Sequence, residues 1–336
     1  MTARKTRIAI NGFGRIGRLA LRAGLDRPDL EFVAINDLSE PDLLQYLFAY
    51  DTMHGRLDAP VGLDGGSLTI DRLAIPMLRQ KDPSQLPWKK LGVDVVLECS
   101  GALRSRRDSA LHLEAGCRKV VISAPSDDAD LTLVMGVNDH LYEPARHHVL
   151  SNASCTTNAL APMAEILHRA FGIQRGFAMT VHAYTSSQAL VDMPQRKRRR
   201  SRAGALNLAP TTTGAAAAVG RVLPELAGKL DGLAVRAPVA DGSIVDLTAQ
   251  LSAAATVDQV NAAFRASSEG KHKGVLKYVE ADGLVSSDIV GDPHSCVFDA
   301  PLTMVLGEMV KVMGWYDNEY AYSCRMLDAA ARVGAL

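Results

Sequence analysis

The start of the chain constrains the fold most, because an apolar strand, a glycine-rich turn, a helix and a second strand follow one another closely. The strands are expected over residues 7–11 and 31–35, and the sequence Gly-Phe-Gly-Arg-Ile-Gly lies between them at 12–17. A G-x-G-x-x-G spacing between a strand and a helix is typical of the first unit of a parallel α/β sheet. It predicts a doubly wound parallel sheet in this part of the chain.

The glycines, together with an acidic residue after the second strand, predict a dinucleotide site. Gly12 permits the tight turn, Gly14 lets the backbone approach a pyrophosphate, and Gly17 allows the helix to pack closely on the strand. Asp37 follows Gly17 by 20 residues, where a carboxylate accepts hydrogen bonds from ribose hydroxyls and repels a 2′-phosphate. The phosphates would lie at the helix N-terminus, and NAD is expected over NADP.

Further α/β units are expected up to about residue 150. Apolar strands are predicted over 92–98, 119–123 and 131–136, with an amphipathic helix over 105–116. Near-continuous apolar strands are typical of parallel sheets that are covered on both faces. Ser123 ends one of these strands, at the sheet edge where open α/β sheets bind ligands.

After residue 150 the pattern changes to long runs in which apolar and polar residues alternate. Alternation predicts antiparallel strands with one covered face. The expected strands are 176–185, 233–238, 243–251, 274–279 and runs within 297–315, and the expected helices are 159–171, 258–268 and 319–333. We therefore predict a dinucleotide-binding domain over 1–152, completed by the C-terminal segment 318–336, and a mainly antiparallel α+β domain over 153–317.

A single thiol stands in a run of small and hydroxylated residues, Ser-Asn-Ala-Ser-Cys-Thr-Thr-Asn at 151–158. The threonines and the asparagine offer helix-capping groups, so Cys155 is expected at or just before the first turn of the following helix. A helix N-terminus favours the thiolate, which is the nucleophilic form of cysteine. The alternative is a small buried cysteine beside a polar loop. The polar run has no other evident use, which favours the nucleophile.

Partners for Cys155 are expected farther along the chain. His182 could take the thiol proton and later accept a proton from a substrate hydroxyl. Thr213 and Gly214 precede an alanine-rich helix, whose N-terminus suits a phosphate. Arg236 stands within an apolar strand, where a cation is rarely buried without a partner. The alternative interpretations are an ordinary core histidine and a structural ion pair.

The composition argues against several classes of protein. Lys and Arg together number 37, as do Asp and Glu, so the chain as a whole carries no charge that would attract a polyanion. It has no run of about 18 apolar residues and no apolar signal region at the N-terminus, so no membrane partner and a cytoplasmic location are expected. The five cysteines lack metal-binding spacing, so no metal is predicted.

One basic run, residues 196–200 with Arg202, stands out from this balance. It could be a solvated loop, a contact with a neighbouring subunit or a phosphate site. It lacks interleaved aromatic residues, so no nucleic-acid partner is expected.

Five motifs of the chain occur together in one known family. They are Asn-Gly-Phe-Gly-Arg-Ile-Gly at 11–17, Ser-Asn-Ala-Ser-Cys-Thr-Thr-Asn at 151–158, His-Ala-Tyr-Thr at 182–185, Pro-Thr-Thr-Thr-Gly-Ala-Ala at 210–216 and Trp-Tyr-Asp-Asn-Glu at 315–319. The chain resembles the phosphorylating glyceraldehyde-3-phosphate dehydrogenases from about residue 6 to about residue 332. The resemblance implies an α/β Rossmann domain, an α+β catalytic domain, NAD as the cofactor and a homotetramer.

Matched by position, the family implies roles for individual residues. Cys155 would be the nucleophile and His182 the base. NAD would be lined, besides the three glycines, by Arg15, Ile16, Asp37, Lys81, Ser123 and Asn318. Substrate and phosphate would be held by Ser154, Thr156, Thr185, Arg202, Thr213, Gly214 and Arg236. Lys81 stands where the family usually has arginine, and the loop 193–198 is far more basic than the family's.

The resemblance implies NAD-dependent oxidation and phosphorylation of glyceraldehyde 3-phosphate to 1,3-bisphosphoglycerate, as in glycolysis and gluconeogenesis. The reaction would proceed through a hemithioacetal and a thioester of Cys155, with the aldehyde and inorganic phosphate as substrates. Two alternatives stay open. Erythrose-4-phosphate dehydrogenase shares the cysteine octet, although Thr185 favours the triose enzyme. A catalytically weak paralogue could instead act as a binding or regulatory protein through the basic loop.

Overall fold

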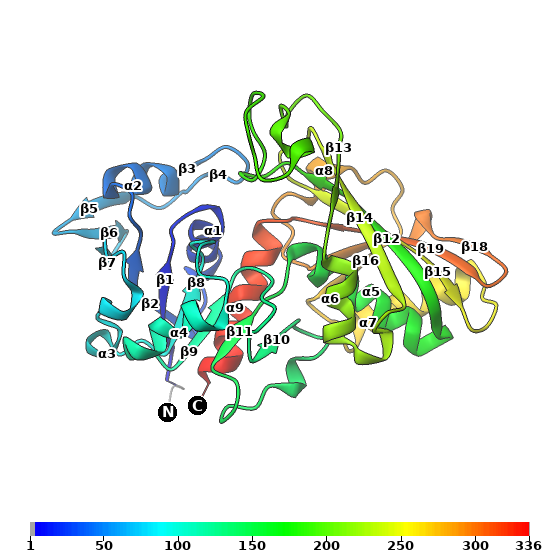
Figure 1. Cartoon of the computed structure of the whole chain (residues 1–336), viewed down its shortest axis with the longest axis horizontal. Helices are drawn as coiled ribbons and strands as arrows, with labels where there is room; N and C mark the ends of the chain where they lie inside the picture. The colour runs from blue at the N-terminus through cyan, green and yellow to red at the C-terminus, as the bar shows by residue number, and fades with distance from the viewer. Residues whose placement is uncertain (1–3, 336) are drawn as a thin grey trace. The chain divides into compact units, whose positions relative to one another are not determined.

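The computed structural model describes residues 4–335; residues 1–3 and 336, the outermost positions of the predicted N-terminal domain, lie outside the described part. The chain forms two compact units, which can be followed by colour in Figure 1. The first comprises the residues up to Leu133, Leu141–Ala153 and the residues from Ser323, and the second comprises Val134–His140 and Ser154–Tyr322.

Within the described residues, the first unit contains a nine-stranded sheet in the order β10-β11-β9-β8-β1-β2-β7-β6-β5. The pairs from β10 to β7 are parallel, and only β7-β6-β5 are antiparallel. The strands are β1 (Thr6–Asn11), β2 (Leu30–Asn36), β5 (Val61–Asp64), β6 (Ser67–Ile70), β7 (Leu73–Leu78), β8 (Val95–Glu98), β9 (Lys119–Ile122), β10 (Leu131–Thr132) and β11 (Val149–Ser151), beside a small hairpin of β3 (Tyr50–Asp51) and β4 (Gly55–Arg56). The predicted doubly wound parallel sheet is confirmed.

The centre of this sheet is buried because its strands are almost wholly apolar. All four residues of β8 and all four of β9 are buried, as the near-continuous apolar runs predict. The helices of the unit are α1 (Arg15–Gly24), α2 (Pro41–Ala49), α3 (Trp88–Leu91), α4 (Arg106–Glu114) and most of α9 (Tyr320–Gly334). The C-terminal helix α9 is tied to this unit by an ion pair of 2.8 Å between Arg27 and Asp328.

One predicted strand is shorter than expected. The run 131–136 forms strand only at Leu131–Thr132. The reason is local, because the Val134 N–H donates to the Asn138 side chain at 2.8 Å instead of continuing the ladder. Gly136 then turns the chain with φ of 81°.

The second unit is built on a sheet in the order β13-β14-β12-β15-β19-β17-β16, with β18 paired to β19. Most pairs are antiparallel as predicted, but β12–β14 and β16–β17 are parallel, so the sheet is mixed. The strands are β12 (Ile173–Ala183), β13 (Ala209–Thr212), β14 (Leu230–Ala237), β15 (Ser243–Leu251), β16 (Leu276–Val279), β17 (Cys296–Asp299), β18 (Met304–Leu306) and β19 (Met309–Tyr316).

Helices cover one face of this sheet. They are α5 (Cys155–Phe171), α6 (Ala215–Val222) and α7 (Val257–Glu269), and the short α8 (Ser286–Ile289) contacts β19. The long helix α5 is buried along most of its length and packs on β15 and β19, which fixes its first turn against the sheet. Within residues 4–335, no helix combines the length and the apolar character needed to cross a bilayer.

Candidate active site

Cys155 is the first residue of α5, and Ser154 caps this helix. The Ser154 hydroxyl accepts a hydrogen bond of 3.0 Å from the Thr157 N–H. The residues expected to cap the helix, Thr156, Thr157 and Asn158, lie within its first turn, because the serine before the thiol supplies the cap. The prediction that Cys155 lies at the first turn is confirmed.

The turn that leads into α5 is strained. Ala153 has φ of 55°, in the left-handed region that residues with a Cβ avoid. An alanine held there costs about 1–2 kcal/mol, and such residues cluster at functional sites. The Ala153 N–H donates to the Ser151 hydroxyl at 3.1 Å, which stabilises the turn. The small and hydroxylated residues before the thiol therefore serve to position the first turn.

Cys155 and His182 lie within contact of each other, although they are 27 residues apart. Sγ is 3.4 Å from Nε2 of His182, which projects from β12 and is 5% exposed. The second ring nitrogen, Nδ1, lies 2.7 Å from the Ala183 carbonyl oxygen and 3.1 Å from a terminal nitrogen of Arg236, so the carbonyl is the nearer of the two. When Nδ1–H donates to that carbonyl, the Nε2 lone pair faces the thiol, and this is the tautomer that a general base needs.

The surroundings of this pair oppose charge separation. Burial raises the pKa of the Cys155 thiol, and the Arg236 charge and hydrogen bonds involving Thr156 act in the opposite direction. Burial also lowers the pKa of His182, and the Arg236 charge adds to that effect. Burial therefore acts against the ionised form of each group, whereas the helix N-terminus and the Arg236 charge act in favour of the thiolate.

Tyr316 of β19 supports both members of the pair. Its hydroxyl lies 2.8 Å from Thr156 Oγ1 and 2.7 Å from Thr180 Oγ1. Its ring meets the His182 ring edge-on, with 5.9 Å between the centroids. A buried phenol with two hydroxyl partners holds its position, so it fixes the first turn of α5 relative to β12.

Arg236 of β14 lies beside the histidine. It donates from one terminal nitrogen to the Ala183 carbonyl at 2.9 Å and to Thr185 Oγ1 at 3.3 Å. Its Nε is buried and has no hydrogen-bond partner in the part of the chain that the structure describes. Burial lowers the pKa of Arg236, and the Arg200 charge adds to that effect. A buried guanidinium with an unmatched donor suits an oxyanion.

Arg200 brings a second cation toward Arg236. Its Nε donates to Thr211 Oγ1 at 3.3 Å, on the strand that precedes α6. Arg202, the arginine predicted to bind phosphate, instead forms a 2.7 Å ion pair with Asp192, and both side chains are largely exposed. Of the two arginines, Arg200 is therefore the one that lies with the candidate anion-binding groups.

In the first unit, a cavity of about 510 Å³ lies at the carboxyl ends of β1, β2 and β8. It is lined by Asn11, Gly12, Gly14, Asn36, Asp37, Leu38, Gln80, Lys81, Pro83, Cys99, Ser100, Ala102 and Leu103. A Cβ on Gly12 would lie 2.4 Å from the Ser100 nitrogen, and one on Gly17 would lie 2.2 Å from the Gly12 oxygen. A Cβ on Gly14 would meet nothing within 4 Å, so Gly14 presents open backbone on the cavity wall.

Asp37 closes one side of this cavity. One carboxylate oxygen accepts from the Phe13 N–H at 2.7 Å, and the other accepts from the Ser39 N–H at 2.9 Å. An ionised carboxylate has about four acceptor positions, so capacity remains for two ribose hydroxyls. The carboxylate thus ties the glycine turn to the end of β2 and faces the cavity with its remaining lone pairs.

Comparison with known proteins agrees with both halves of this geometry. Residues 6–106 match the family model "Glyceraldehyde 3-phosphate dehydrogenase, NAD binding domain", and residues 154–318 match the C-terminal domain of the same family. Glyceraldehyde-3-phosphate dehydrogenase of Geobacillus stearothermophilus is 52% identical over 330 residues, which cover 98% of each chain. The enzyme of Streptomyces coelicolor is 51% identical over 331 residues, with the same coverage. The Bacillus subtilis protein named glyceraldehyde-3-phosphate dehydrogenase 1 is 50% identical over 328 residues, covering 97% of this chain and 98% of its own.

The chain belongs to the glyceraldehyde-3-phosphate dehydrogenase family. The cavity of the first unit lies in the part of the chain that matches the family's NAD-binding domain. Its residues fit NAD, because the open backbone at Gly14 leaves room for a pyrophosphate and the Asp37 carboxylate can accept ribose hydroxyls. A volume of about 510 Å³ also lies within the usual range of cofactor sites.

The structure brings some of the predicted cofactor residues to this cavity and leaves others outside its lining. Gly12, Gly14, Asp37 and Lys81 line it. Gly17 lies behind the glycine turn and does not line the cavity. Arg15 forms a 2.5 Å ion pair with Asp51, and Ile16 lies half-buried in the first turn of α1. Ser123 donates its N–H to the Glu98 carbonyl at the end of β8, and the roles of Arg15, Ile16 and Ser123 toward NAD stay predictions.

The remaining predicted residues lie in the second unit. Asn318 is buried and accepts a 2.6 Å hydrogen bond from Ser243, which fixes its amide group. The Thr213 hydroxyl accepts from the Ala215 N–H at 3.2 Å at the start of α6, next to Gly214. Their roles toward nicotinamide and phosphate stay predictions.

Sequence reasoning gave no role to Tyr316 or Ser243, and it considered Arg200 only as one member of the basic run 196–200. Tyr316 appears only as a member of a motif, and its two hydroxyl partners stand 160 and 136 positions away. Arg200 is one cation within a continuous basic run, which gives no indication of which member turns inward. Ser243 lacks any motif at all, so no sequence signal would have found it.

Proposed function

We propose that the chain catalyses the NAD-dependent oxidation and phosphorylation of glyceraldehyde 3-phosphate to 1,3-bisphosphoglycerate, a reaction of glycolysis and gluconeogenesis. The observation that carries the proposal is the 3.4 Å contact between Cys155 Sγ and His182 Nε2. Cys155 is a nucleophile with its base already in place, in a chain whose relatives at 50–52% identity bear this enzyme's name.

In the oxidative half, Cys155 Sγ attacks the aldehyde carbon while its proton passes to His182 Nε2. The oxyanion that forms lies near the N-terminus of α5, where backbone N–H groups stabilise negative charge. It takes the proton from Nε2 and becomes the hemithioacetal hydroxyl. NAD, when bound, supplies the hydride acceptor. His182 accepts the hydroxyl proton as the hydride leaves the same carbon, and a thioester of Cys155 remains.

In the phosphorylating half, an oxygen of inorganic phosphate attacks the thioester carbon and the Cys155 thiolate leaves. The proton on His182 returns to the sulfur, and the acyl phosphate is released. The thioester keeps the acyl group activated until phosphate arrives, so the energy of oxidation is not lost to hydrolysis. Tyr316 contributes by holding the imidazole and the first turn in register.

The phosphate groups of the substrates are assigned to the side of the Cys155–His182 pair where Arg236 and Arg200 lie. Arg236 offers its buried Nε, and Arg200 adds a second guanidinium from the loop before β13. Thr185 and Thr213 add hydroxyls. We assign phosphate binding to Arg200 in place of Arg202, because the latter is engaged with Asp192 and exposed.

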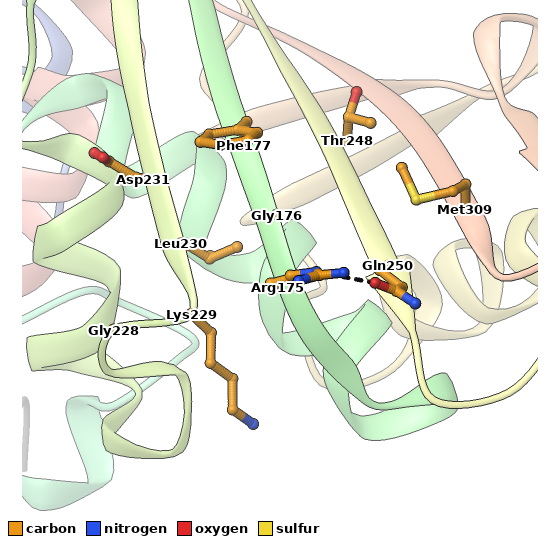
Figure 2. Close-up of a pocket in the computed structure, with 10 residues that line it drawn as sticks. All are labelled: Arg175, Gly176, Phe177, Gly228, Lys229, Leu230, Asp231, Thr248, Gln250 and Met309. Carbon is orange, nitrogen blue, oxygen red and sulfur yellow. Dashed lines mark hydrogen bonds between the residues drawn. The ribbon is translucent and has the colours of Figure 1, made fainter.

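The homotetramer is proposed from the outer face of the second unit's sheet. Along β12 the side chains of Phe177, Met179 and Val181 point outward, and Phe177 is 73% exposed. A groove of about 370 Å³ is lined by Phe177, Arg175 and Gln250 among other residues, and Figure 2 shows the 3.0 Å hydrogen bond from Arg175 of β12 to Gln250 of the neighbouring strand β15. Apolar side chains gathered on one exposed face mark an association surface. The family resemblance implies four copies, which light scattering would count, and Phe177→Asp should give smaller species.

A cytoplasmic location, and the absence of metal, membrane and nucleic-acid partners, stay predictions.

A steady-state assay tests the function. Glyceraldehyde 3-phosphate and erythrose 4-phosphate are compared, each with and without inorganic phosphate and with NAD or NADP. The proposal expects the highest kcat/KM for the triose with NAD and a strict need for phosphate in multiple turnovers. Preference for erythrose 4-phosphate would assign the chain to that enzyme. No turnover with either aldehyde would favour a binding or regulatory protein.

A further inference from the structure

A buried carboxylate lies beneath the cofactor cavity of the first unit. Glu98, the last residue of β8, is 1% exposed. One of its oxygens accepts from Asn11 Nδ2 at 2.6 Å and lies 3.0 Å from His112 Nε2. The other accepts from the Ser100 N–H at 2.8 Å and from the Ser100 hydroxyl at 2.5 Å. Burying an unpaired carboxylate would be very costly, so four contacts on one group indicate a built arrangement.

The protonation of this cluster follows from Trp88. An indole N–H can only donate, and Trp88 Nε1 lies 3.0 Å from His112 Nδ1. Nδ1 is therefore the acceptor, and His112 carries its proton on Nε2, where it donates to Glu98. The Asn11 amide, the His112 Nε2–H and the Ser100 N–H are then all donors to the Glu98 carboxylate, and the Ser100 hydroxyl can donate as well.

The contacts extend from Glu98 to the far wall of the cavity. Asn11 donates to Glu98, and its Oδ1 accepts from Asn36 Nδ2 at 2.7 Å. Asn36 in turn donates to the Gln80 carbonyl at 3.0 Å and accepts from the Gln80 N–H at 2.9 Å. Because a carboxylate can only accept, it fixes which way the Asn11 amide points, and Asn11 fixes Asn36. The chain of contacts ends beside Lys81, which also lines the cavity.

We propose that Glu98 is a positioning residue that preorganises the adenosine side of the NAD site. Asn11, Asn36, Gln80 and Ser100 all line the cavity, and Glu98 holds each of them directly or through one or two amides. The Gln80 end belongs to the adenosine side, because the Asp37 N–H donates to the Leu78 carbonyl at 3.1 Å and Asp37 is the carboxylate predicted to bind the adenosine ribose. A wall that is already in place does not have to be ordered when the cofactor binds, and this raises affinity.

Glu98→Gln tests the proposal with almost no change in volume. The amide presents one oxygen and one NH₂ group, so two of the four donors lose their acceptor and face another donor. The orientation of Asn11 is then no longer specified. We expect Kd for NAD to rise at least about tenfold, and Kd for ADP, which lacks nicotinamide, to rise by the same factor. Both are measured by calorimetry with the intact protein.

A matched control is available in the second unit. Glu165 of α5 is also 1% exposed; His272 Nε2 lies 3.0 Å from it, Arg169 pairs with it at 2.6 Å, and Lys271 donates to it. None of these residues lines the cofactor cavity. Glu165→Gln should lower the stability to urea about as much as Glu98→Gln and leave both Kd values within twofold. Equal losses of ADP affinity in the two variants would make the Glu98 effect a general loss of stability and overturn the proposal.

A double-mutant cycle with Asn36→Ala separates action through the amides from an independent effect. If Glu98 acts through Asn36, the two substitutions together should weaken ADP binding by much less than the product of the single effects. Multiplicative effects would overturn the relay. Should Glu98→Gln fail to fold, Asn36→Ala alone decides, because unchanged ADP affinity in that variant would show that the wall needs no such support. A Glu98→Gln protein that folds and binds ADP normally would also refute the proposal.

Discussion

Replacing Asp37 with asparagine is expected to relax the preference for NAD over NADP. The substitution removes one negative charge and keeps the size of the side chain. The carboxylate accepts N–H bonds from Phe13 and Ser39, and the asparagine oxygen can keep one of the two. The glycine turn should therefore remain in place while the charge beside the ribose disappears.

The expected magnitude follows from Coulomb's law. A 2′-phosphate carries about −1.5 to −2 charges and would lie roughly 5 Å from a carboxylate that binds the same ribose. In the dielectric of water each pair of unit charges at that distance costs about 0.8 kcal/mol. The repulsion is then about 1.5 kcal/mol, or about tenfold in kcat/KM. This value is a lower bound, because a partly enclosed cavity screens charge less than water does.

Arg79, a cation that contacts the residue after Asp37, allows a second substitution to be added to this experiment. Arg79 donates to both carboxylate oxygens of Glu40 at 2.9 Å and to the Leu38 carbonyl at 3.1 Å. The arginine next to the ribose side is thus engaged by Glu40, in an exposed pair worth about 0–1 kcal/mol. Adding Glu40→Gln to Asp37→Asn releases this guanidinium and should raise the use of NADP several-fold further.

The assay compares kcat/KM for NAD and NADP at low ionic strength, where exposed charges act most strongly. Lys197→Asp, in the basic run of the second unit, is the control and should change the ratio less than Asp37→Asn does. Equal or better use of NADP by the native chain would refute the reasoning. If Lys197→Asp changes the ratio of kcat/KM for NAD to that for NADP more than Asp37→Asn does, the basic run and not Asp37 decides the choice of cofactor.

Four further predictions concern the second unit. Cys155→Ser should abolish oxidation and leave NAD affinity near normal, and retained activity above a few per cent would contradict this. His182→Asn should slow alkylation of Cys155 by iodoacetamide at pH 7 by at least about tenfold, since no base takes the thiol proton. An unchanged alkylation rate would contradict the second prediction. Burial opposes the ionised form of Glu165, but hydrogen bonds from its partners outweigh burial and lower its pKa from 4.5 to about 2. Because the folded pKa is the lower one, its stabilisation is full above pH 4.5 and is lost between pH 4.5 and 2. It amounts to about 3 kcal/mol, and the decline in urea stability over that window should be absent in Glu165→Gln. Arg200→Ala should raise KM for phosphate at least about tenfold, whereas Arg202→Ala should leave it within twofold.

The cofactor half of the site could be predicted from sequence because its determinants are local. The turn at Gly12, the open backbone at Gly14 and the carboxylate of Asp37 lie within one strand–helix–strand unit, and each follows from a steric or electrostatic requirement at a fixed spacing. The same holds for Cys155, whose place at the start of α5 follows from capping chemistry within a few residues. Short-range rules of this kind hold because they do not depend on contacts with distant parts of the chain.

The supports of both sites could not be predicted, because they depend on contacts between distant positions. Glu98 meets Asn11 across 87 residues, and Tyr316 meets Thr156 across 160. Nothing in the spacing of a glutamate or a tyrosine indicates which buried donor it will meet. The same limit applies to the burial that raises the pKa of the Cys155 thiol, because this burial is a property of the packed sheet and not of the helix N-terminus.

The proposed assignment of phosphate binding to Arg200 in place of Arg202 rests on the backbone geometry of the loop. Residues 198–201 form a short 3-10 helix, which turns about 120° per residue, and Arg202 follows at its end with extended backbone. Two side chains that are two residues apart there cannot point the same way. Once Arg200 is directed at Thr211, Arg202 is directed to solvent, where Asp192 pairs with it. A run of five consecutive cations therefore fixes the charge near the phosphate groups, but only the backbone geometry decides which cation delivers it.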